Sequence, residues 1–584
     1  MNMRRTKIVC TLGPATDDEE VLRKLIKNGM NVARLNFSHG DHEEHKRRMD
    51  MVKKLRAELN RPVGILLDTR GPEIRIKKFR DGNIELKEGA SFTLTGREVE
   101  GTEEEVSLTY PNLSQDVNIG SIILVDDGLI ELEVREIREQ DIVCTVKNGG
   151  KLSNNKSINI PGSHISLPYM NDSDREDIIF GIEQDVDFIA ASFVRNRDDV
   201  MEVRRLLENN GGKDIQIISK IENREGVDNF DRILKMSDGV MVARGDLGVE
   251  IPFQEIPQIQ KMMIRGGRRA GKIVITATQM LDSMIRNPRP TRAEASDVAN
   301  AIYDGTTAIM LSGETAMGKY PLDALKAMND IALSTEADIN YVRRFRRMEE
   351  CGQVNITNAI SHATCTTAHD LNAKAILTVT NSGHTARMVS KFRPACPILA
   401  TTAYQKSYYQ MSLVWGVTPW MVEQQHTTDE LFDSAVKAAE QSGMVKSGDL
   451  VVISAGVPVG ISGTTNILKV QIVGNVLVRG ERVLQQRAFG NLCVCKTEEE
   501  ALANFTPGDI LVIPQTSNNL LSIMKNAKAI ITEEAGSTSH AAIVGMSLDI
   551  PVVTGAANAT SLLKSGLSVT VDSARGLVLS GTQD

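Results

Sequence analysis

Short runs of aliphatic and β-branched residues recur through the first half of the chain, and stretches of mixed polar and apolar residues lie between them. There are eight such runs: KIVCTLG, VARLNF, VGILLD, FIAASF, IQIISKI, GVMVAR, IVITAT and AIMLS. Nearly continuous apolarity is typical of parallel strands that are buried on both faces of a sheet. Strands of this kind predict an α/β fold, and the simplest arrangement of eight is a closed (β/α)₈ barrel.

The third and fourth runs are separated by roughly 120 residues with a different pattern. Polar and apolar residues alternate there, as in NIELKEGASFTLTG, and Asp126-Asp127-Gly128 forms a turn signal. Alternation of this kind predicts strands with one buried face, so we expect a small β-barrel domain inserted into the larger barrel. The predicted boundaries are 1–70 and 169–345 for the barrel and 71–168 for the insert.

Two further units follow the barrel. A helix predicted from about Ile356 and the strands AILTVT, PILATT and GDLVVISAG indicate an α/β domain over 346–473. A third α/β unit covers 474–584 and contains the Gly-rich and Ser-rich segment EEAGSTSHAAIVG. Four domains agree with a length of 584 residues, since domains hold roughly 100–200 residues each.

Composition argues against nucleic-acid-binding, secreted and membrane proteins. The net charge of −8 and the pI near 5.8 argue against a nucleic-acid-binding protein, which usually carries a basic excess on one face. Seven scattered cysteines fit a reducing compartment. The start of the chain has no signal-peptide pattern, and no apolar run reaches the roughly 18 residues of a membrane span. We therefore expect a cytoplasmic protein that binds neither nucleic acid nor membrane.

Polar residues follow six of the eight runs. Because the carboxyl ends of barrel strands share one mouth, these residues are expected to meet there. Two carboxylates on neighbouring strand ends suit a hard divalent cation, and an oxygen-rich cluster suits a larger monovalent one. Together with cations, they match phosphoryl transfer, in which charge on the moving group must be stabilised. The carboxylates are Glu222 and Asp246; the oxygen cluster is Asn36, Ser38, Asp68 and Thr69; the cations are Arg34, Arg75, Lys156, Lys220 and Arg244.

Each residue also has a structural interpretation. Lys220-Ile221-Glu222 alone is more often a salt bridge than a site, and Asp246 or Thr278 could cap a helix. Convergence of six strand ends on one rim favours the functional interpretation.

The segments RTKIVCTLGP, NVARLNFSHG, LLDTRGPEIR, IISKIENREGV, MVARGDLGVEIP, ITATQMLDSM, NPRPTRAEASDVANA and MLSGETAMGKYP resemble pyruvate kinases along the whole barrel. The resemblance implies transfer of a phosphoryl group from phosphoenolpyruvate to ADP, giving pyruvate and ATP. It implies that Lys220 stabilises the transition state and that Glu222 and Asp246 bind Mg²⁺ or Mn²⁺. By the same resemblance, the remaining site residues are Arg34, Gly245, Asp246 and Thr278 for the substrate, Asn36, Ser38, Asp68 and Thr69 for K⁺, and Asn36, His39, Arg75 and Lys156 for the nucleotide.

Further expectations follow from the resemblance. The insert should act as a lid with hinges at Gly71-Pro72 and near Pro168, and Thr278 with water is the candidate for protonating enolpyruvate. A glutamate at position 73 goes with K⁺ dependence in this family. Arg70 stands where lysine is common, and Thr307 replaces the usual aspartate, both with small expected effects.

Thr380-Asn381-Ser382-Gly383-His384-Thr385 follows a predicted strand and opens a predicted helix. Such a segment suits either an anion site or a capped turn. Resemblance to allosteric pyruvate kinases favours a site for an activating sugar phosphate or nucleotide monophosphate, and implies a homotetramer.

The segment from Ile531 to Ala542, ITEEAGSTSHAA, resembles the swivelling phosphohistidine domain of phosphoenolpyruvate-utilising enzymes, with His540 at the phosphorylated position. No ATP-grasp partner is recognisable, so we expect a structural or regulatory role. Two alternatives stay open: a dikinase-like phosphotransferase that works through His540, and a catalytically silent effector-binding scaffold.

Overall fold

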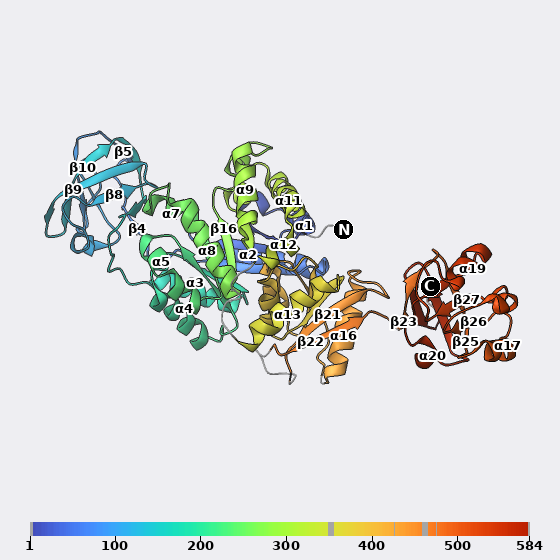
Figure 1. Ribbon diagram of the computed structural model, residues 1–584. Helices are drawn as coiled ribbons and strands as arrows, with labels where there is room; N and C mark the ends of the chain where they lie inside the picture. The colour runs from blue at the N-terminus through green and yellow to red at the C-terminus, as the bar shows by residue number, and fades with distance from the viewer. Residues whose placement is uncertain (1–3, 348–354, 426, 458–464, 475, 582–584) are drawn as a thin grey trace. The chain divides into compact units, whose positions relative to one another are not determined.

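The computed structural model describes residues 4–347, 355–425, 427–457, 465–474 and 476–581 (Figure 1). The barrel, the insert and the loop at 380–385 belong to one compact unit, and the last sheet belongs to a second. In the part of the chain that the structure describes, no helix is both long and apolar enough to cross a membrane.

The eight predicted strands form a closed, all-parallel barrel in the order β1-β17-β16-β15-β14-β13-β3-β2. Every residue of these strands except Asn36 is buried, which confirms the interpretation of the apolar runs. The strands are β1 (Lys7–Thr11), β2 (Val32–Asn36), β3 (Gly64–Asp68), β13 (Phe188–Ala191), β14 (Gln216–Ile221), β15 (Gly239–Ala243), β16 (Ile273–Ala277) and β17 (Ala308–Leu311).

Several helices between the strands start at side chains that cap them. Asp18, Asp41, Asn171 and Asn196 each accept hydrogen bonds from backbone N–H groups of the first turn, and Thr291 forms a capping box with Glu294. The helices are α1 (Glu19–Lys27), α2 (His42–Glu58), α3 (Asp172–Glu183), α4 (Arg197–Asn209), α5 (Arg224–Asp228), α6 (Phe230–Met236), α7 (Arg244–Glu250), α8 (Ile256–Ala270), α9 (Arg292–Asp304), α10 (Gly313–Ala316), α11 (Pro321–Asp338) and α12 (Tyr341–Arg346).

The insert is the expected β domain, with its own buried apolar core. One sheet has the order β4-β12-β8-β9-β10-β6-β7, and a second pairs β11 with β5. Asp126, Asp127 and Gly128 all have positive φ and form the predicted turn between two of these strands. The strands are β4 (Ile74–Arg75), β5 (Asn83–Leu86), β6 (Ser91–Thr95), β7 (Glu105–Ser107), β8 (Ile122–Val125), β9 (Ile130–Arg138), β10 (Asp141–Asn148), β11 (Gly150–Ser153) and β12 (Ser157–Asn159).

The α/β region after the barrel has one sheet in the order β20-β19-β18-β21-β22. The helix predicted from Ile356 begins there, and a helix follows the Thr380–Thr385 loop as expected. The elements are α13 (Ile356–Asp370), β18 (Ala375–Val379), α14 (His384–Ser390), β19 (Ile398–Thr402), α15 (Gln405–Gln410), β20 (Val417–Met421), α16 (Thr428–Gln441), β21 (Leu450–Ala455) and β22 (Ile467–Ile472).

The last unit contains an eight-stranded mixed sheet in the order β23-β30-β29-β25-β26-β27-β28-β24. Its elements are β23 (Val476–Arg479), β24 (Glu481–Arg482), β25 (Arg487–Val494), α17 (Glu498–Asn504), β26 (Ile510–Ile513), α18 (Leu521–Met524), β27 (Ala529–Thr532), α19 (His540–Leu548), β28 (Val552–Thr554), α20 (Ala559–Leu562), β29 (Ser568–Asp572) and β30 (Leu577–Ser580).

Candidate active site

A chain of buried charges crosses the barrel at the carboxyl ends of β2, β3 and β14. Arg34 Nε donates to Asp68 Oδ2 at 2.6 Å, and Arg34 Nη1 donates to Thr11 Oγ1 at 2.9 Å. Lys220 Nζ lies 3.1 Å from Asp68 Oδ1. Burial opposes ionisation of Asp68, but the Arg34 and Lys220 cations outweigh it and hold the pKa of Asp68 below its usual range. Asp68 is therefore a charged carboxylate between two cations.

Lys220 has a second acidic partner. Its Nζ lies 2.9 Å from Glu222 Oε1 and donates to Ser192 Oγ at 2.8 Å. Burial disfavours the ammonium, but the carboxylates of Asp68 and Glu222 outweigh burial and raise the pKa of Lys220. The side chain is thus a permanently charged, fixed cation, as the stabilisation of a transferring phosphoryl group requires.

Glu222 is completely buried, and its Oε2 accepts a hydrogen bond of 2.6 Å from the backbone N–H of Phe193. Burial raises the pKa of Glu222 despite the neighbouring Lys220, and Asp246 adds a like charge. A carboxylate in these surroundings gains from a further cation. Glu222 and Asp246 therefore form a donor pair that fits a divalent metal with waters and substrate oxygens completing its shell.

Thr278 has a strained backbone, with φ of 71°, and Gln279 after it has φ of 54°. Three hydrogen bonds from the Arg244 guanidinium to the Ala277 and Thr278 carbonyls hold this turn. The Thr278 hydroxyl accepts a hydrogen bond of 3.3 Å from the backbone N–H of Gly245. These bonds hold four residues together at the ends of β15 and β16: Arg244, Gly245, Ala277 and Thr278.

The two capping interpretations are wrong. Asp246 lies inside α7, whose N-cap residue is Ala243 and makes no side-chain cap bond. Thr278 precedes no helix directly, since the next helical turn begins at Asp282. Neither residue has the structural role that its sequence context allowed.

The oxygen-rich cluster is only partly free of protein partners. Asn36 Oδ1 accepts from the backbone N–H of Ser38 at 3.2 Å, and Thr69 Oγ1 accepts from the N–H of Ser192 at 3.1 Å. Each oxygen keeps further lone pairs, because carbonyl and hydroxyl oxygens can accept more than one bond. The donor chemistry therefore fits a monovalent cation.

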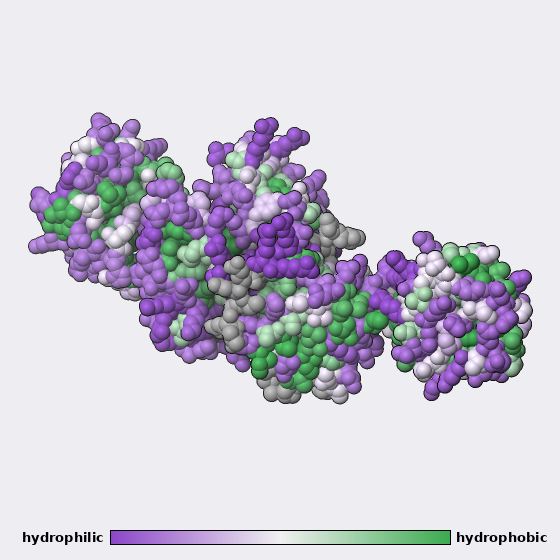
Figure 2. Space-filling view, in the orientation of Figure 1, coloured by the Kyte–Doolittle hydropathy of each residue, from purple (hydrophilic) through white to green (hydrophobic). Residues whose placement is uncertain are grey.

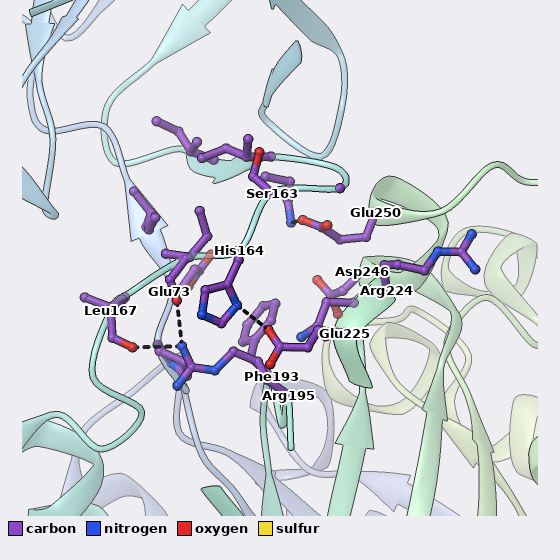
Figure 3. Close-up of a pocket in the computed structure, with 18 of the residues that line it drawn as sticks. Glu73, Ser163, His164, Leu167, Phe193, Arg195, Arg224, Glu225, Asp246 and Glu250 are labelled. Carbon is purple, nitrogen blue, oxygen red and sulfur yellow. Dashed lines mark hydrogen bonds and ion pairs between the residues drawn. The ribbon is translucent and has the colours of Figure 1, made fainter. Parts of the chain in front are cut away.

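The insert and the barrel enclose a pocket, and Figure 3 draws most of the residues that line it. Asn159 Nδ2 donates to Glu250 Oε1 at 3.0 Å, and His164 Nδ1 lies 3.1 Å from Glu225 Oε2. Arg195 Nη1 donates to backbone carbonyls of the segment that leads out of the insert, at 3.1 Å and 2.8 Å. Asp246 and Glu73 line the same pocket, so it opens onto one of the two candidate metal ligands, Asp246.

Three predicted nucleotide residues contact other groups. Arg75 donates to Glu73 Oε2 through Nε at 3.0 Å and through Nη2 at 2.8 Å. Lys156 Nζ pairs with Asp126 Oδ1 at 2.8 Å within the insert. His39 is exposed, and its backbone carbonyl accepts from His45. The structure does not bring these three side chains together with Lys220.

Ser192 is a site residue that the sequence interpretation missed. Its hydroxyl contacts Lys220, Asp68 Oδ1 at 3.2 Å and the Thr69 carbonyl at 2.7 Å. It directly follows β13, so the rule that selected the other six strand ends could have found it. Phe193, with φ of 53°, and Asn159 have no comparable signal in the sequence.

Comparison with known proteins agrees with this geometry. A family model for the pyruvate kinase barrel domain matches residues 3–325, and one for the pyruvate kinase alpha/beta domain matches residues 358–471. A pyruvate kinase from Sporosarcina psychrophila is 52% identical over 583 residues, and one from Geobacillus stearothermophilus is 53% identical over 580 residues, each covering 99% of both chains. The chain belongs to the pyruvate kinase family.

Membership confirms the reaction expected from the barrel motifs, which is phosphoryl transfer from phosphoenolpyruvate to ADP in glycolysis. A third family model, for the mobile domain of phosphoenolpyruvate-utilising enzymes, matches residues 505–576. It confirms the kind of domain expected at the end of this pyruvate kinase.

Outside the barrel, the loop from Thr380 to Thr385 connects β18 to α14 as predicted. Gly383 has φ of 76° and Thr385 Oγ1 lies 2.9 Å from Thr465 Oγ1. The carbonyl of Ser382 accepts a hydrogen bond of 3.1 Å from Arg387 Nη1.

His540 is the first residue of α19. Its Nδ1 lies 2.9 Å from Thr516 Oγ1, and its Nε2 lies 3.1 Å from Asn518 Oδ1. Both ring nitrogens thus have polar neighbours within hydrogen-bond distance.

Proposed function

We propose that this pyruvate kinase transfers the phosphoryl group at the barrel mouth, with Lys220 as the cation that stabilises the moving group. The observation that carries the proposal is the pairing of Lys220 with two buried carboxylates, Asp68 and Glu222. A fixed ammonium in a buried site stabilises developing negative charge without reorganisation.

Glu222 and Asp246 are proposed ligands for Mg²⁺ or Mn²⁺. The like charges and the burial of Glu222 support this role, because a divalent cation would offset both. Bound there, the metal would supply charge neutralisation for phosphate oxygens. The chain's contribution is to hold the two carboxylates on adjacent strand ends.

We assign the substrate to Arg34, Gly245, Asp246 and Thr278, and the nucleotide to Asn36, His39, Arg75 and Lys156. Support is strongest for Arg34 and Asp246 of the first group, whose charges act on Lys220. Thr278 is the proposed proton donor to enolpyruvate, together with ordered water. For the second group, Arg75 and Lys156 would exchange their partners Glu73 and Asp126 for phosphate oxygens.

A K⁺ ion is proposed among Asn36, Ser38, Asp68 and Thr69. Glu73 supports this proposal through the resemblance, in which a glutamate at this position goes with K⁺ dependence. Burial raises the pKa of Glu73, and the nearby carboxylates of Asp246 and Asp127 add to the rise although Arg75 opposes it. A cation near this acidic group would stabilise its ionised form.

The insert, 71–168, is proposed to close over the mouth as a lid. Excluding water protects a transferable phosphoryl group from hydrolysis. The Asn159 to Glu250 hydrogen bond and the pocket of Figure 3 support contact between the two domains on closure. The other proposed boundaries are 1–70 with 169–345 for the barrel, 346–473 for the effector domain and 474–584 for the terminal domain.

The loop 380–385 is the proposed site for a phosphorylated activator, and the assembly is proposed to be a homotetramer, which size-exclusion chromatography with light scattering would measure. Symmetric oligomers with two global states readily connect an effector site to a distant active site. For His540 we propose a structural or regulatory role, supported by its two polar neighbours.

One experiment separates this proposal from the alternatives. Pyruvate formation from phosphoenolpyruvate and ADP is measured for the wild type and His540→Ala. Near-normal turnover in His540→Ala supports barrel chemistry, whereas collapse supports a phosphohistidine route. Acid-labile phosphate on His540 after incubation with labelled phosphoenolpyruvate would also support that route. A wild type without turnover would indicate a silent scaffold.

A further inference from the structure

Two aspartates at the amino-terminal end of the barrel have the same double function. Asp187, which precedes β13, accepts a hydrogen bond from the backbone N–H of Ile65 at 2.8 Å and one from Arg56 of α2 at 3.3 Å. Asp238, which precedes β15, accepts from a backbone N–H of β14 at 2.9 Å and from Arg204 of α4 at 2.6 Å. Each aspartate thus binds a backbone N–H of the neighbouring strand. It also neutralises an arginine of the helix that precedes that neighbouring strand.

Thr307 has the equivalent position before β17. It binds the neighbouring strand as the aspartates do, but it has no charge with which to neutralise an arginine. Its hydroxyl accepts a hydrogen bond of 3.2 Å from the backbone N–H of Val274 in β16. The helix before β16 is α8, which carries Arg268 in its last turn. Because threonine has no charge, it gives Arg268 no carboxylate, and the electrostatics of Arg268 show none among the described residues. Within the described residues, the electrostatic neighbours that shift its pKa are all arginines: burial and then Arg344, Arg265 and Arg269 lower it.

Arg268 and Thr307 line a small hollow that is partly open to solvent and has a cavity volume of about 20 Å³. Five of its eleven lining residues are cationic, and none is acidic. The lining comes from four parts of the same compact unit: the end of α8 with the start of β16, Thr307 before β17, α14 with the segment after it, and Val414-Trp415 before β20. The cations are Arg268, Lys272, Arg387, Lys391 and Arg393.

Arg393 provides a donor without an acceptor. Its side chain is only 6% exposed, and its Nε is buried with no hydrogen-bond partner among the described residues. Nη2 donates to the Gly305 carbonyl at 2.9 Å, and the guanidinium lies 4.4 Å from the centre of the Trp415 ring. Burial and then Arg268 lower the pKa of Arg393 to about 9, and the opposing effects of Tyr341 and Glu336 do not outweigh them. A buried cation with an unused donor is costly unless an anion joins it.

The other cations differ in how they are held. Lys272 donates to three backbone carbonyls, and Lys391 donates to the Asn358 side chain. Their ammonium groups contribute charge to the hollow while their hydrogen bonds go elsewhere. Arg387 donates one nitrogen to the Ser382 carbonyl, so the hollow adjoins the loop that connects β18 to α14.

The surface beside the hollow is also basic. Figure 2 shows a strongly hydrophilic patch over α12, a helix that contains Arg343, Arg344 and Arg346. Arg344 acts electrostatically on both Arg268 and Arg393, so this patch adds to the positive potential at the hollow. Positive potential of this kind attracts anions and accelerates their binding.

We propose that the hollow defined by Arg268, Thr307, Arg387 and Arg393 is an oxyanion site that binds a phosphate group, either free inorganic phosphate or the terminal phosphate of a metabolite. The site is separate from the barrel mouth and from the loop 380–385. A phosphate group accepts several hydrogen bonds and matches the planar donor fork of arginine. It would supply the negative charge that aspartate supplies at positions 187 and 238.

The test is isothermal titration calorimetry of inorganic phosphate into the full-length protein. Thr307→Asp restores a carboxylate beside Arg268, so phosphate affinity at this site should fall at least tenfold. Thr307→Ser keeps the hydroxyl without adding charge and should bind like the wild type. Arg268→Gln should weaken phosphate binding to a similar extent. If Thr307→Asp does not fold, Arg268→Gln tests the site in its place. Phosphate isotherms that are the same for wild type, Thr307→Asp and Arg268→Gln would overturn the proposal.

A second arm distinguishes the two sources of phosphate. Glycerol 2-phosphate is titrated into the same proteins. Binding that Thr307→Asp weakens would extend the site to phosphate esters, while binding of inorganic phosphate alone would restrict it to the free ion. If Thr307→Asp weakens the binding of neither inorganic phosphate nor glycerol 2-phosphate, the proposed site is contradicted.

Discussion

The Nζ of Lys220 lies 3.1 Å from Oδ1 of Asp68, and Asp68 in turn binds Arg34. The three residues come from the ends of β14, β3 and β2 and are brought together by closure of the barrel. Asp68 therefore fixes the positions of two cations that would otherwise repel each other. The relationship makes Asp68 a positioning residue for the proposed phosphoryl-binding cations as well as a proposed K⁺ ligand.

Asp68→Asn should reduce kcat at least about a hundredfold and lower the melting temperature. Removing one partner from a buried charge network leaves uncompensated charge, which costs on the order of 3–5 kcal/mol. Steady-state kinetics and thermal melting measure the two effects. Asp50→Asn, at an exposed ion pair with Lys46, is the matched control and should leave both unchanged. Normal turnover in Asp68→Asn would argue against the positioning role.

Activity is expected to depend on K⁺. The cluster of Asn36, Ser38, Asp68 and Thr69 offers a monovalent cation oxygen ligands without nitrogen or sulfur donors. Turnover is measured in Na⁺-free tetramethylammonium buffer with and without KCl. Full activity in the absence of KCl would contradict the proposed K⁺ dependence.

Ser382→Glu should abolish activation by phosphorylated metabolites and leave basal turnover near normal. A carboxylate in the loop would repel an effector phosphate, and the loop lies outside the barrel mouth. Activity is titrated with ribose 5-phosphate and with AMP, and Ser382→Thr is the control that keeps a hydroxyl. An unchanged effector response in Ser382→Glu would count against this site.

Lys7→Met should stabilise the protein more at low pH than at high pH. Lys7 is buried at the start of β1 and donates to the Val417 carbonyl at 2.7 Å. Burial, and then Arg4, lower its pKa from 10.5 to about 7. The folded chain therefore binds fewer protons than the unfolded chain between these values, so the cost of Lys7 is full below about pH 7 and disappears toward pH 10.5.

The measurement is the melting temperature of Lys7→Met relative to wild type at pH 6 and pH 9.5, with exposed Lys24→Met as control. The advantage of Lys7→Met should shrink as the pH rises. A difference that is independent of pH would show that the lysine is charged in the folded protein throughout this range.

Apolar runs predicted all eight barrel strands because burial on both faces leaves a strong local pattern. The same rule predicted that Arg34, Asp68 and Lys220 meet, since strand ends share a mouth. The ion-pair partners of the predicted nucleotide residues were not predictable from the sequence. Arg75 pairs with Glu73 and Lys156 pairs with Asp126, and the tertiary packing of the insert sets both pairs. Ser192 was not predicted as a site residue, because a serine at a strand end has no distinctive chemistry of its own. Its role follows from its contact with Lys220 in the folded chain.

Thr307 shows a different limit of sequence reasoning. Its replacement of aspartate was expected to have small effects because it touches no proposed ligand of the barrel mouth. Arg268 and Arg393, which line the hollow together with Thr307, come from separate segments and meet only in the folded chain. The significance of one substitution therefore depended on neighbours that the sequence does not reveal.

The most direct test of the account is kcat for pyruvate formation from phosphoenolpyruvate and ADP by Lys220→Met, compared with the exposed-lysine control Lys213→Met. Loss of a preorganised cation that contacts the transferring group should lower kcat by about 10³-fold or more, on the scale of removing one transition-state donor. Lys213→Met should stay within about twofold of wild type, as surface changes usually do. If Lys220→Met retained kcat within tenfold of wild type while remaining folded, the assignment of phosphoryl transfer to the barrel mouth would be contradicted.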